Sequence, residues 1–438
     1  MDRRCTILEC LTPADRAVVI QDGRAVRALE LQDRAERLRC LINQHSWQRV
    51  ALRTERADTV IVALAASQGC SCDVLLLRDD YSADDPVWSA WQAEALLDDE
   101  FAVRRAFPGS KAEGSGCVLL TTSGTTGRPK VAAHSIEVLA SRVTKEKLRT
   151  DTARWLLTFH PASYAGLQVI LTILFTRAEL IAFVRPNVSD LLKAAQTEQP
   201  THVSATPTFW RSLLIASSHL DAKMEFRQIT IGGEAVDQST LDQLSRTFST
   251  ARITHIYAST EAGALFSVSD KRAGFPAAWM DIGVEGVKLR IREGILEILS
   301  PRAMKGYVGE LSSKNQADDG WLISGDLVEI VGDRVLFRGR IDNIINVGGA
   351  KVMPEEVEAV LLQHEAVREA MVFGQRNPLV GAIVCADIVL SPGFDGEEVR
   401  TSIYSHASQR LEAHKLPRVL RFVTAIGTNA AGKKVRLI

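Results

Sequence analysis

Short apolar strands alternate with helical stretches over much of the first 260 residues, and this alternation constrains the fold more than any other feature. Strand-like segments such as "RVALRT", "DVLLLR" and "ELIAFV" are separated by helical stretches such as "ADTVIVALAASQGC" and "LLKAAQTEQ". The pattern continues through "THVSATP", "FWRSLLIASS", "QITIGGEAV", "STLDQLSRTF" and "ITHIYAST". Strands that are separated by helices form βαβ units. The sequence therefore predicts an α/β fold with parallel sheets.

The pattern changes after about residue 280. The segments "GVKLRIREGILEILS" and "LVEIVGDRVLFRG" read as short strands joined by tight polar turns, which is typical of antiparallel hairpins. Beyond "RGRIDN" the chain has two helical segments and a strand. We predict a large N-terminal domain, residues 1–340, made of α/β subdomains with a small β-rich part. A small, mobile α+β domain, residues 341–438, follows it.

Composition narrows the class of protein. The 438 residues are 46% apolar and 24% charged, as in ordinary globular chains, and the formal net charge of -1 offers no basic field for nucleic acid. The start, "MDRRCTILECLTPADR", is too polar for a signal-peptide core, and "GLQVILTILF" is too short to span a bilayer. Cys70 and Cys72 lack the partners of a zinc site. We expect a cytoplasmic protein without a membrane span or a nucleic-acid partner.

The stretch "CVLLTTSGTTGRPKV", residues 117–131, runs from a strand into a loop of hydroxyls and glycines. Exposed N–H groups in such a loop can hold phosphate oxygens, and Lys130 adds a positive charge. The stretch is not the phosphate loop of the kinase-type NTPases, because Val131 follows the lysine where a Ser or Thr is required. Taken alone, a flexible surface linker explains the same residues equally well.

Further stretches follow in a fixed order: "IGGEAV", "YASTEAG", "SGD", "RGRIDN" and "GKKVR". With the loop they resemble the adenylate-forming superfamily, which contains acyl- and aryl-CoA synthetases, peptide-synthetase adenylation domains and firefly-type luciferases. The resemblance extends from about residue 50 to the end of the chain. It departs from the family at Val131, where glycine is usual, and after the hinge, where a second basic residue is usual and this chain has Asn343 and Asn346. The N-terminal region is shorter than in most relatives.

The resemblance implies a role for each motif. The cofactors would be ATP and Mg²⁺. The implied ATP contacts are Thr122, Ser123, Gly124, Thr125, Thr126, Gly127 and Lys130 at the phosphates, Gly233, Glu234, Ala235 and Tyr257 at the adenine, and Asp326 and Arg340 at the ribose. Thr260 would lie near the α-phosphate, Glu261 would hold the metal, Asp342 would be the hinge, and Lys433 the mobile catalytic lysine.

General chemistry agrees with these roles. A carboxylate that attacks a phosphate must overcome repulsion between anions, and N–H donors, magnesium and an ammonium group lower that barrier. Simpler interpretations remain for single residues. Glu261 could be a surface acid, Tyr257 a core aromatic, Asp326 a hairpin-turn residue, and Lys433 a solvated tail lysine whose role Lys434 takes.

The acid is expected to bind beside "WLLTFHPASYAGLQVILTILF", residues 155–175, which contains no Asp or Glu. A substrate ammonium would have no partner there, so we disfavour an α-amino acid. His160, Tyr164 and Gly166 are the expected wall of an acyl or aryl pocket.

The acceptor is expected at "NVGGAKVMPEEVEAV", residues 346–360, where Gly348 and Gly349 leave room for a pantetheine arm. The arm could belong to coenzyme A or to the phosphopantetheine of an acyl carrier protein. The same letters also fit a glycine turn before a capped helix. We therefore predict an ATP-dependent acid–thiol ligase that acts through an acyl-adenylate. The alternatives are a stand-alone adenylation enzyme that loads a carrier protein, and a nucleotide- or acyl-binding protein without turnover.

A first prediction concerns the lysine. Lys433→Ala should nearly abolish acyl-AMP formation while ATP still binds, because the ammonium stabilises charge in the transition state. Pyrophosphate release and ATP binding, measured separately, test this. Lys434→Ala is the matched control, and loss of adenylation in that variant alone would show that the wrong lysine was chosen.

Overall fold

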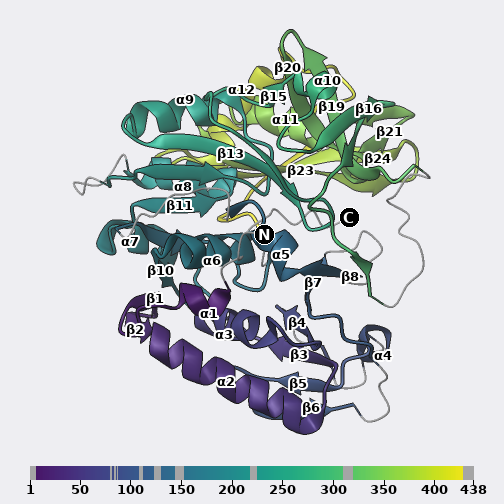
Figure 1. Cartoon of the computed structure of the whole chain (residues 1–438). Helices are drawn as coiled ribbons and strands as arrows, with labels where there is room; N and C mark the ends of the chain where they lie inside the picture. Colours follow the sequence, from purple (N-terminus) through teal and green to yellow (C-terminus); the bar gives the residue numbers. More distant parts are fainter. Residues whose placement is uncertain are drawn as a thin grey trace.

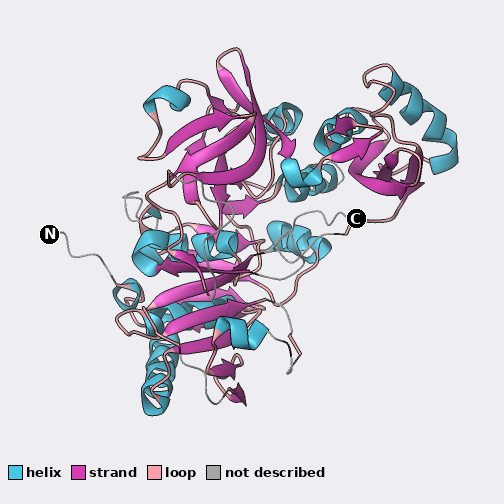
Figure 2. Ribbon diagram, turned by 90° about the vertical axis from the view of Figure 1, so that its right-hand side faces the viewer, coloured by secondary structure: helices cyan, strands magenta, loops and turns pink. Residues whose placement is uncertain are grey.

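The structure is a computed structural model, and it describes residues 6–78, 81–82, 85, 87–107, 112–122, 130–143, 152–217, 224–308 and 319–427. Two large sheets are stacked with helices between them, a smaller sheet lies beyond, and a small lobe stands to one side (Figures 1 and 2). The α/β fold with parallel sheets, a β-rich part and a small α+β domain is confirmed.

The first large sheet has seven strands in the order β18-β8-β7-β4-β3-β5-β6. Strands β3, β4, β5 and β7 are parallel neighbours, while β6, β8 and β18 pair antiparallel. The bounds are β3 Arg49–Arg53, β4 Asp73–Leu77, β5 Ala95–Leu97, β6 Val103–Ala106, β7 Cys117–Thr122, β8 Lys130–Ser135 and β18 Gly306–Tyr307, with helix α4 at Val87–Trp91.

The second large sheet has eight strands in the order β14-β13-β12-β11-β9-β10-β1-β2. Its six inner strands are parallel, and its two edge strands are antiparallel. The strands are β1 Ala17–Gln21, β2 Arg24–Arg27, β9 Arg154–Leu157, β10 Glu179–Ala182, β11 His202–Ala205, β12 Gln228–Ile231, β13 Arg252–Ser259 and β14 Gly263–Val268. The first fifty residues are thus part of the fold, since β1 lies beside β10.

Helices cover both faces of the eight-stranded sheet. Every residue of α3 is buried because this helix lies between the two large sheets, and its sequence is apolar all round. Trp210 of α8 anchors the opposite face, and its indole N–H donates to the main-chain oxygen of Thr230 at 3.0 Å. The helices are α1 Ile7–Cys10, α2 Ala28–His45, α3 Ala57–Ser67, α5 Ile136–Ala140, α6 Tyr164–Thr176, α7 Val188–Thr197, α8 Pro207–Ser217 and α9 Gln238–Thr247.

The remaining chain forms two five-stranded sheets. The β-rich part has the order β15-β20-β19-β17-β16, and the C-terminal part has β22-β21-β24-β23 with β25 beside β24. The elements are β15 Phe275–Pro276, α10 Trp279–Ile282, β16 Lys288–Arg292, β17 Ile295–Leu299, β19 Leu322–Val331, β20 Arg334–Arg340, the 3₁₀ helix η2 Ile341–Asn343, β21 Ile345–Val347, β22 Ala350–Val352, α11 Pro354–Leu361, β23 Val367–Asn377, β24 Gly381–Leu390, α12 Gly396–Ser408 and β25 Val419–Phe422. The expected domain boundary falls where β20 ends, and it stays a prediction. Among the described helices, none is long and apolar enough to cross a bilayer.

A buried ion cluster joins α2 to the start of α3. Asp58 is fully buried and accepts from Arg34 at 2.7 Å and from Arg56 at 2.9 Å. Burial raises the pKa of Asp58, but the hydrogen bonds from Arg56 and Arg34 outweigh burial, so its pKa lies below 3.8. Because the folded-state pKa is lowered, the carboxylate's stabilisation is fully present above pH 3.8 and is lost as the pH falls through the folded-state value.

Asp58→Asn should lower the free energy of unfolding at pH 7 by about 3 kcal/mol, because it leaves two guanidinium groups without their buried charge partner. The difference from wild type should shrink as the pH falls below 3.8. Urea unfolding at a series of pH values measures this. Asp333→Asn is the control, because the Arg272–Asp333 pair is exposed and should contribute little. Equal effects of the two substitutions would contradict the account.

Candidate active site

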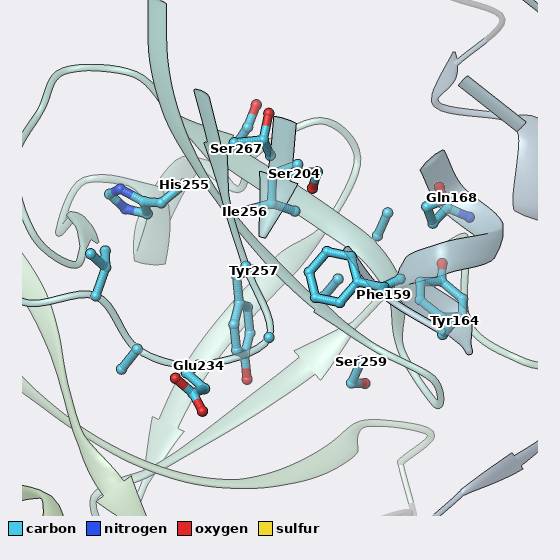
Figure 3. Close-up of a pocket in the computed structure, with 18 of the residues that line it drawn as sticks. Phe159, Tyr164, Gln168, Ser204, Glu234, His255, Ile256, Tyr257, Ser259 and Ser267 are labelled. Atoms are coloured by element: carbon cyan, nitrogen blue, oxygen red, sulfur yellow. The ribbon is translucent and has the colours of Figure 1, made fainter. Parts of the chain in front are cut away.

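A cleft of about 1460 Å³ opens where the eight-stranded sheet, the β-rich sheet and α11 meet. It lies at the carboxyl ends of β12 and β13, where ligands bind in open α/β sheets. Figure 3 shows Tyr257 and Glu234 in one part of this pocket and Phe159, Tyr164 and Gln168 in another. The motifs of the sequence are distributed around it.

Tyr257, Asp326 and Arg340 form one corner of the cleft. The Tyr257 hydroxyl donates to Asp326, and Arg340 Nη1 lies 3.2 Å from the other carboxylate oxygen. Asp326 is on β19, directly opposite Arg340 on β20, so it belongs to a strand rather than to a hairpin turn. Burial, and then the Asp326 charge, raise the pKa of Tyr257 far above 10.0, which keeps the phenol a neutral donor. One carboxylate with an adjacent cation can accept hydroxyl donors such as those of a ribose.

The loop of Gly233, Glu234 and Ala235 follows β12 and lines the same cleft. Gly233 has φ +85°, a left-handed conformation that favours glycine. Glu234 accepts from the Thr208 hydroxyl at 2.9 Å, which ties the loop to the start of α8. The loop is therefore held in place at the cleft.

Thr260 and Glu261 lie in the tight turn between β13 and β14. Gly263 ends this turn at φ +83°, and a Cβ there would lie 2.3 Å from the main-chain oxygen of Arg302, so no larger residue fits. The main-chain oxygen of Glu261 accepts from Met304 at 2.9 Å. These constraints hold the Glu261 carboxylate in place at the edge of the cleft.

Tyr307 is a site residue that the sequence motifs did not reveal. Its hydroxyl donates to Glu261 Oε1 at 3.1 Å, and its ring lies 5.0 Å from Lys130 Nζ. Burial, and then Glu261, raise the pKa of Tyr307, so it stays a neutral donor. Tyr307 is placed by β18, which pairs with β8, and β8 pairs Lys130 with Thr122 of β7. An isolated tyrosine in a two-residue strand carries no sequence signal.

The donor set around Glu261 fits magnesium. Among the described residues, no three His, Cys, Asp or Glu side chains gather as a metal cage. Mg²⁺ usually takes one or two carboxylates and fills the other positions with water and phosphate oxygens. A single held carboxylate is therefore sufficient, and Tyr307 holds that of Glu261 through Oε1.

The expected acid wall is only partly at the cleft. Tyr164 lines it, together with Phe159. His160 instead lies 2.8 Å from Glu55 and accepts from the Ala162 N–H, and it is not among the described lining residues. Gly166 packs against the main chain of His160, because a Cβ at Gly166 would lie 2.1 Å from the main-chain oxygen of His160. Gly166 thus permits close packing at the start of α6.

The expected site residues after β20 are also only partly at the cleft. Asp342 lines the cleft, and its carboxylate lies 3.7 Å from Arg340. Gly348 and Gly349 form the β21–β22 turn, with φ +57° and +90°, and do not line the described cleft. Six further expected residues lie outside the described part of the chain: Ser123, Gly124, Thr125, Thr126, Gly127 and Lys433.

Two family models match this chain. The family model described as AMP-binding enzyme matches residues 18–308, and the one described as AMP-binding enzyme C-terminal domain matches residues 356–433. The chain belongs to the AMP-binding enzyme family. The predicted membership of the adenylate-forming superfamily is confirmed. The expected start of the resemblance, near residue 50, was wrong, because the family match begins at residue 18, within β1.

Relatives of this family include named CoA ligases. The 2-succinylbenzoate–CoA ligase of Bacillus licheniformis is 27% identical over 336 residues, which cover 73% of this chain and 68% of that protein. Feruloyl-CoA synthase of an Amycolatopsis species is 27% identical over 341 residues, which cover 72% and 68%. The solved structure of o-succinylbenzoate coenzyme A synthetase from Bacillus subtilis with ATP and magnesium has a TM-score of 0.75 at 22% identity, and covers 99% of this chain and 98% of that one. That likeness shows a shared fold.

Tyr307→Phe should raise the magnesium concentration for half-maximal activity about 10-fold, because partners that orient a metal ligand typically contribute that much to metal affinity. Activity at saturating magnesium should change little. Magnesium titrations of both half-reactions measure this effect. Glu261→Gln is the comparison, and it should remove activity at all magnesium concentrations. A Tyr307→Phe titration that superimposes on wild type would show that Tyr307 does not position Glu261.

Proposed function

We propose that this chain is an AMP-forming acid–thiol ligase. It activates a carboxylic acid with ATP, releases pyrophosphate, and transfers the acyl group to coenzyme A. The observation that carries this proposal is the convergence on one cleft of Asp326 and Arg340 from one side and Glu261 from the other. Tyr307 contacts both Glu261 and Lys130, which keeps Lys130 close to this second side. Family membership and the names of the relatives support it.

The nucleotide is proposed to lie across the cleft. Asp326 accepts the ribose hydroxyls, with Tyr257 and Arg340 holding its carboxylate in orientation. The Gly233–Ala235 loop faces the base. Lys130 is proposed to reach the phosphates; its main chain pairs with Thr122 of β7, and these two residues flank the proposed phosphate-binding segment. A relative in the same fold binds ATP with magnesium.

In the first half-reaction, a carboxylate oxygen of the acid attacks the α-phosphorus, and the bond to pyrophosphate breaks. Bound magnesium would neutralise charge on the phosphate oxygens. Glu261 would hold that ion, while Thr260 and the mobile Lys433 donate to oxygens whose charge grows in the transition state. The phosphate that stays with the acid becomes the AMP half of a mixed anhydride.

In the second half-reaction, a thiolate attacks the carbonyl carbon of the adenylate and AMP leaves. Gly348 and Gly349 would face the thiol's pantetheine arm, but in this structure α11, with Glu355 and Glu358, lies at the cleft instead. The small domain must therefore turn between the two steps. Asp342, at the cleft edge after β20, is the proposed hinge.

Coenzyme A is the favoured acceptor because the relatives are named as CoA ligases. A carrier-protein phosphopantetheine would offer the same thiol, and it is kept as the alternative acceptor. ATP and coenzyme A are both plentiful in the cytoplasm, which agrees with the location expected from composition.

The proposal is tested by ATP–pyrophosphate exchange with a panel of aryl, alkyl and amino acids, followed by thioester detection with coenzyme A or a phosphopantetheinylated carrier protein. We expect exchange with aryl or acyl acids, none with α-amino acids, and thioester on coenzyme A. Nucleotide binding without exchange for any acid would instead support a non-catalytic binding protein.

Gly349→Leu should reduce thioester formation at least tenfold and leave pyrophosphate exchange near normal, because the side chain narrows the path of the pantetheine arm. Gly393→Leu is a matched control: both glycines have φ +90°, lie in the same domain and have open space at Cβ. It carries the same backbone strain without touching the path. Equal loss of both half-reactions in Gly349→Leu would contradict the proposed channel.

Asp342→Pro, which fixes φ and removes a donor, should trap one orientation of the small domain. The two half-reactions should then change by very different factors when exchange and thioester transfer from preformed acyl-AMP are measured separately. A uniform decrease in both would mean that the C-terminal residues serve one fixed site.

A further inference from the structure

Arg142 is a charged side chain at the acid end of the cleft that no motif accounts for. It follows α5, lines the cleft together with Tyr164, Gln168 and Ser267, and its side chain is 15% exposed. Nη2 donates to the Ser267 hydroxyl at 2.7 Å and lies 3.2 Å from Glu285 Oε1. Among the described residues, both polar contacts of the Arg142 side chain are made by Nη2.

The balance of charge around Arg142 differs from that around Arg340 and Arg211, which also line the cleft. Arg340 and Arg211 have partners, Asp326 and Asp237, that line the cleft with them. Glu285 does not line it, and its side chain is 39% exposed, so water screens its attraction for Arg142. A ligand in the cleft therefore meets the guanidinium rather than a neutral pair.

The cleft lining that Arg142 shares with Phe159 and Tyr164 also includes polar, uncharged side chains. Ser204 and Gln168 line the cleft with Ser267, and Figure 3 shows all three beside Phe159 and Tyr164. The Gln168 amide N–H donates to the main-chain oxygen of Leu139, so its own oxygen remains an acceptor. Two aromatic rings, several hydroxyls and a guanidinium suit an acid whose aryl group or short chain ends in a second group that accepts hydrogen bonds.

The position of Arg142 fixes where that group would lie. The reacting carboxylate must be beside the turn that carries Thr260 and Glu261. Ser267 lies on β14 opposite Ile256, three residues beyond Ala264, which is about 10 Å along a strand. The distal group would thus be separated from the reacting carboxylate by more than one aromatic ring spans, at about the length of a ring with a short side chain or of an extended suberate chain.

We propose that Arg142 selects acids that carry a second anionic group, a distal carboxylate, at this separation from the carboxylate that is activated. This inference rests on the proposed function and names its substrate class. A guanidinium binds a carboxylate through two parallel hydrogen bonds. On Arg142 this fork would combine one Nη2 hydrogen with Nη1 or Nε, so the ligand carboxylate would replace Glu285 while the other Nη2 hydrogen stays on Ser267. Arg142 is thus a specificity-determining residue.

The test compares matched acids. Suberate against octanoate, and 3-(4-carboxyphenyl)propanoate against 3-(4-methylphenyl)propanoate, differ mainly in the distal carboxylate, and 2-succinylbenzoate extends the panel. The quantity measured is the ratio of kcat/KM for the diacid to that for the monoacid. Wild type should favour at least one diacid. Arg142→Leu should lower that ratio at least tenfold by reducing diacid turnover while the monoacid keeps its rate, and Arg142→Lys should restore part of it.

Two further variants separate selection from a structural role. Glu285→Gln removes the competing carboxylate and should raise the ratio. Arg227→Leu is the control, because Arg227 also lines the cleft but lies before β12 and donates to the Thr152 hydroxyl. It should leave the ratio unchanged. A wild type that favours every monoacid, an equal loss for both acids in Arg142→Leu, or a ratio that follows Arg227 would each overturn the proposal.

Calorimetric binding of the same acids keeps this test independent of turnover. If no acid supports pyrophosphate exchange, the proposed ligase activity fails, yet tighter binding of diacids to wild type than to Arg142→Leu would still support the anion site. Equal binding of diacid and monoacid to wild type would overturn it even if the ligase activity were established.

Discussion

The pairing of a two-residue strand with the strand that carries Lys130 is the contact on which the site depends. Tyr307 of β18 lies opposite Ala132 of β8, and the flanking N–H groups of Lys305 and Val308 donate to β8 at 2.8 and 2.9 Å. This pairing joins the seven-stranded sheet to the segment that follows the β16–β17 hairpin. It also brings Tyr307 to Glu261, a residue of the other large sheet. Without this pairing, the strand that carries Lys130 and the turn that carries Glu261 would not be linked through Tyr307.

The stacking of the two large sheets explains why so small a contact is sufficient. Helix α3 is wholly buried between them, and the Arg34–Asp58–Arg56 cluster fixes its start. A rigid core of this kind lets short loops hold side chains accurately at the strand ends, which is where preorganised charges act in catalysis. The small domain contributes differently. Its Glu355 packs against Gly339 of β20, where a Cβ would lie 2.6 Å from the Glu355 carboxylate, so the present orientation has a close contact that a turn about the proposed hinge would break.

The sequence predicted the parts of this molecule that depend on local pattern. Alternating strands and helices predicted the sheets. Asp326, Tyr257 and Arg340 lie together at the cleft, and their expected contacts with ATP stay a prediction. Residues whose role depends on distant pairing were not predictable. Tyr307 and Arg142 carry no motif, and each reaches the site through contacts with residues far away in the chain. His160 was expected at the acid pocket, but Glu55, more than a hundred residues earlier, holds its ring elsewhere. The role of β1 was missed because its partner β10 lies beyond residue 178.

The central claim is that a carboxylate oxygen of the acid bonds to the α-phosphorus of ATP in this cleft. Isotope transfer tests it most directly. An acid that supports turnover is labelled with ¹⁸O in both carboxylate oxygens and incubated with ATP, magnesium and coenzyme A, and the products are analysed by mass spectrometry. The account predicts AMP that carries one ¹⁸O atom, because that oxygen bridges the acyl group and phosphorus and stays with AMP when the thiol attacks. Unlabelled AMP, or label in inorganic phosphate with ADP as the nucleotide product, would contradict it.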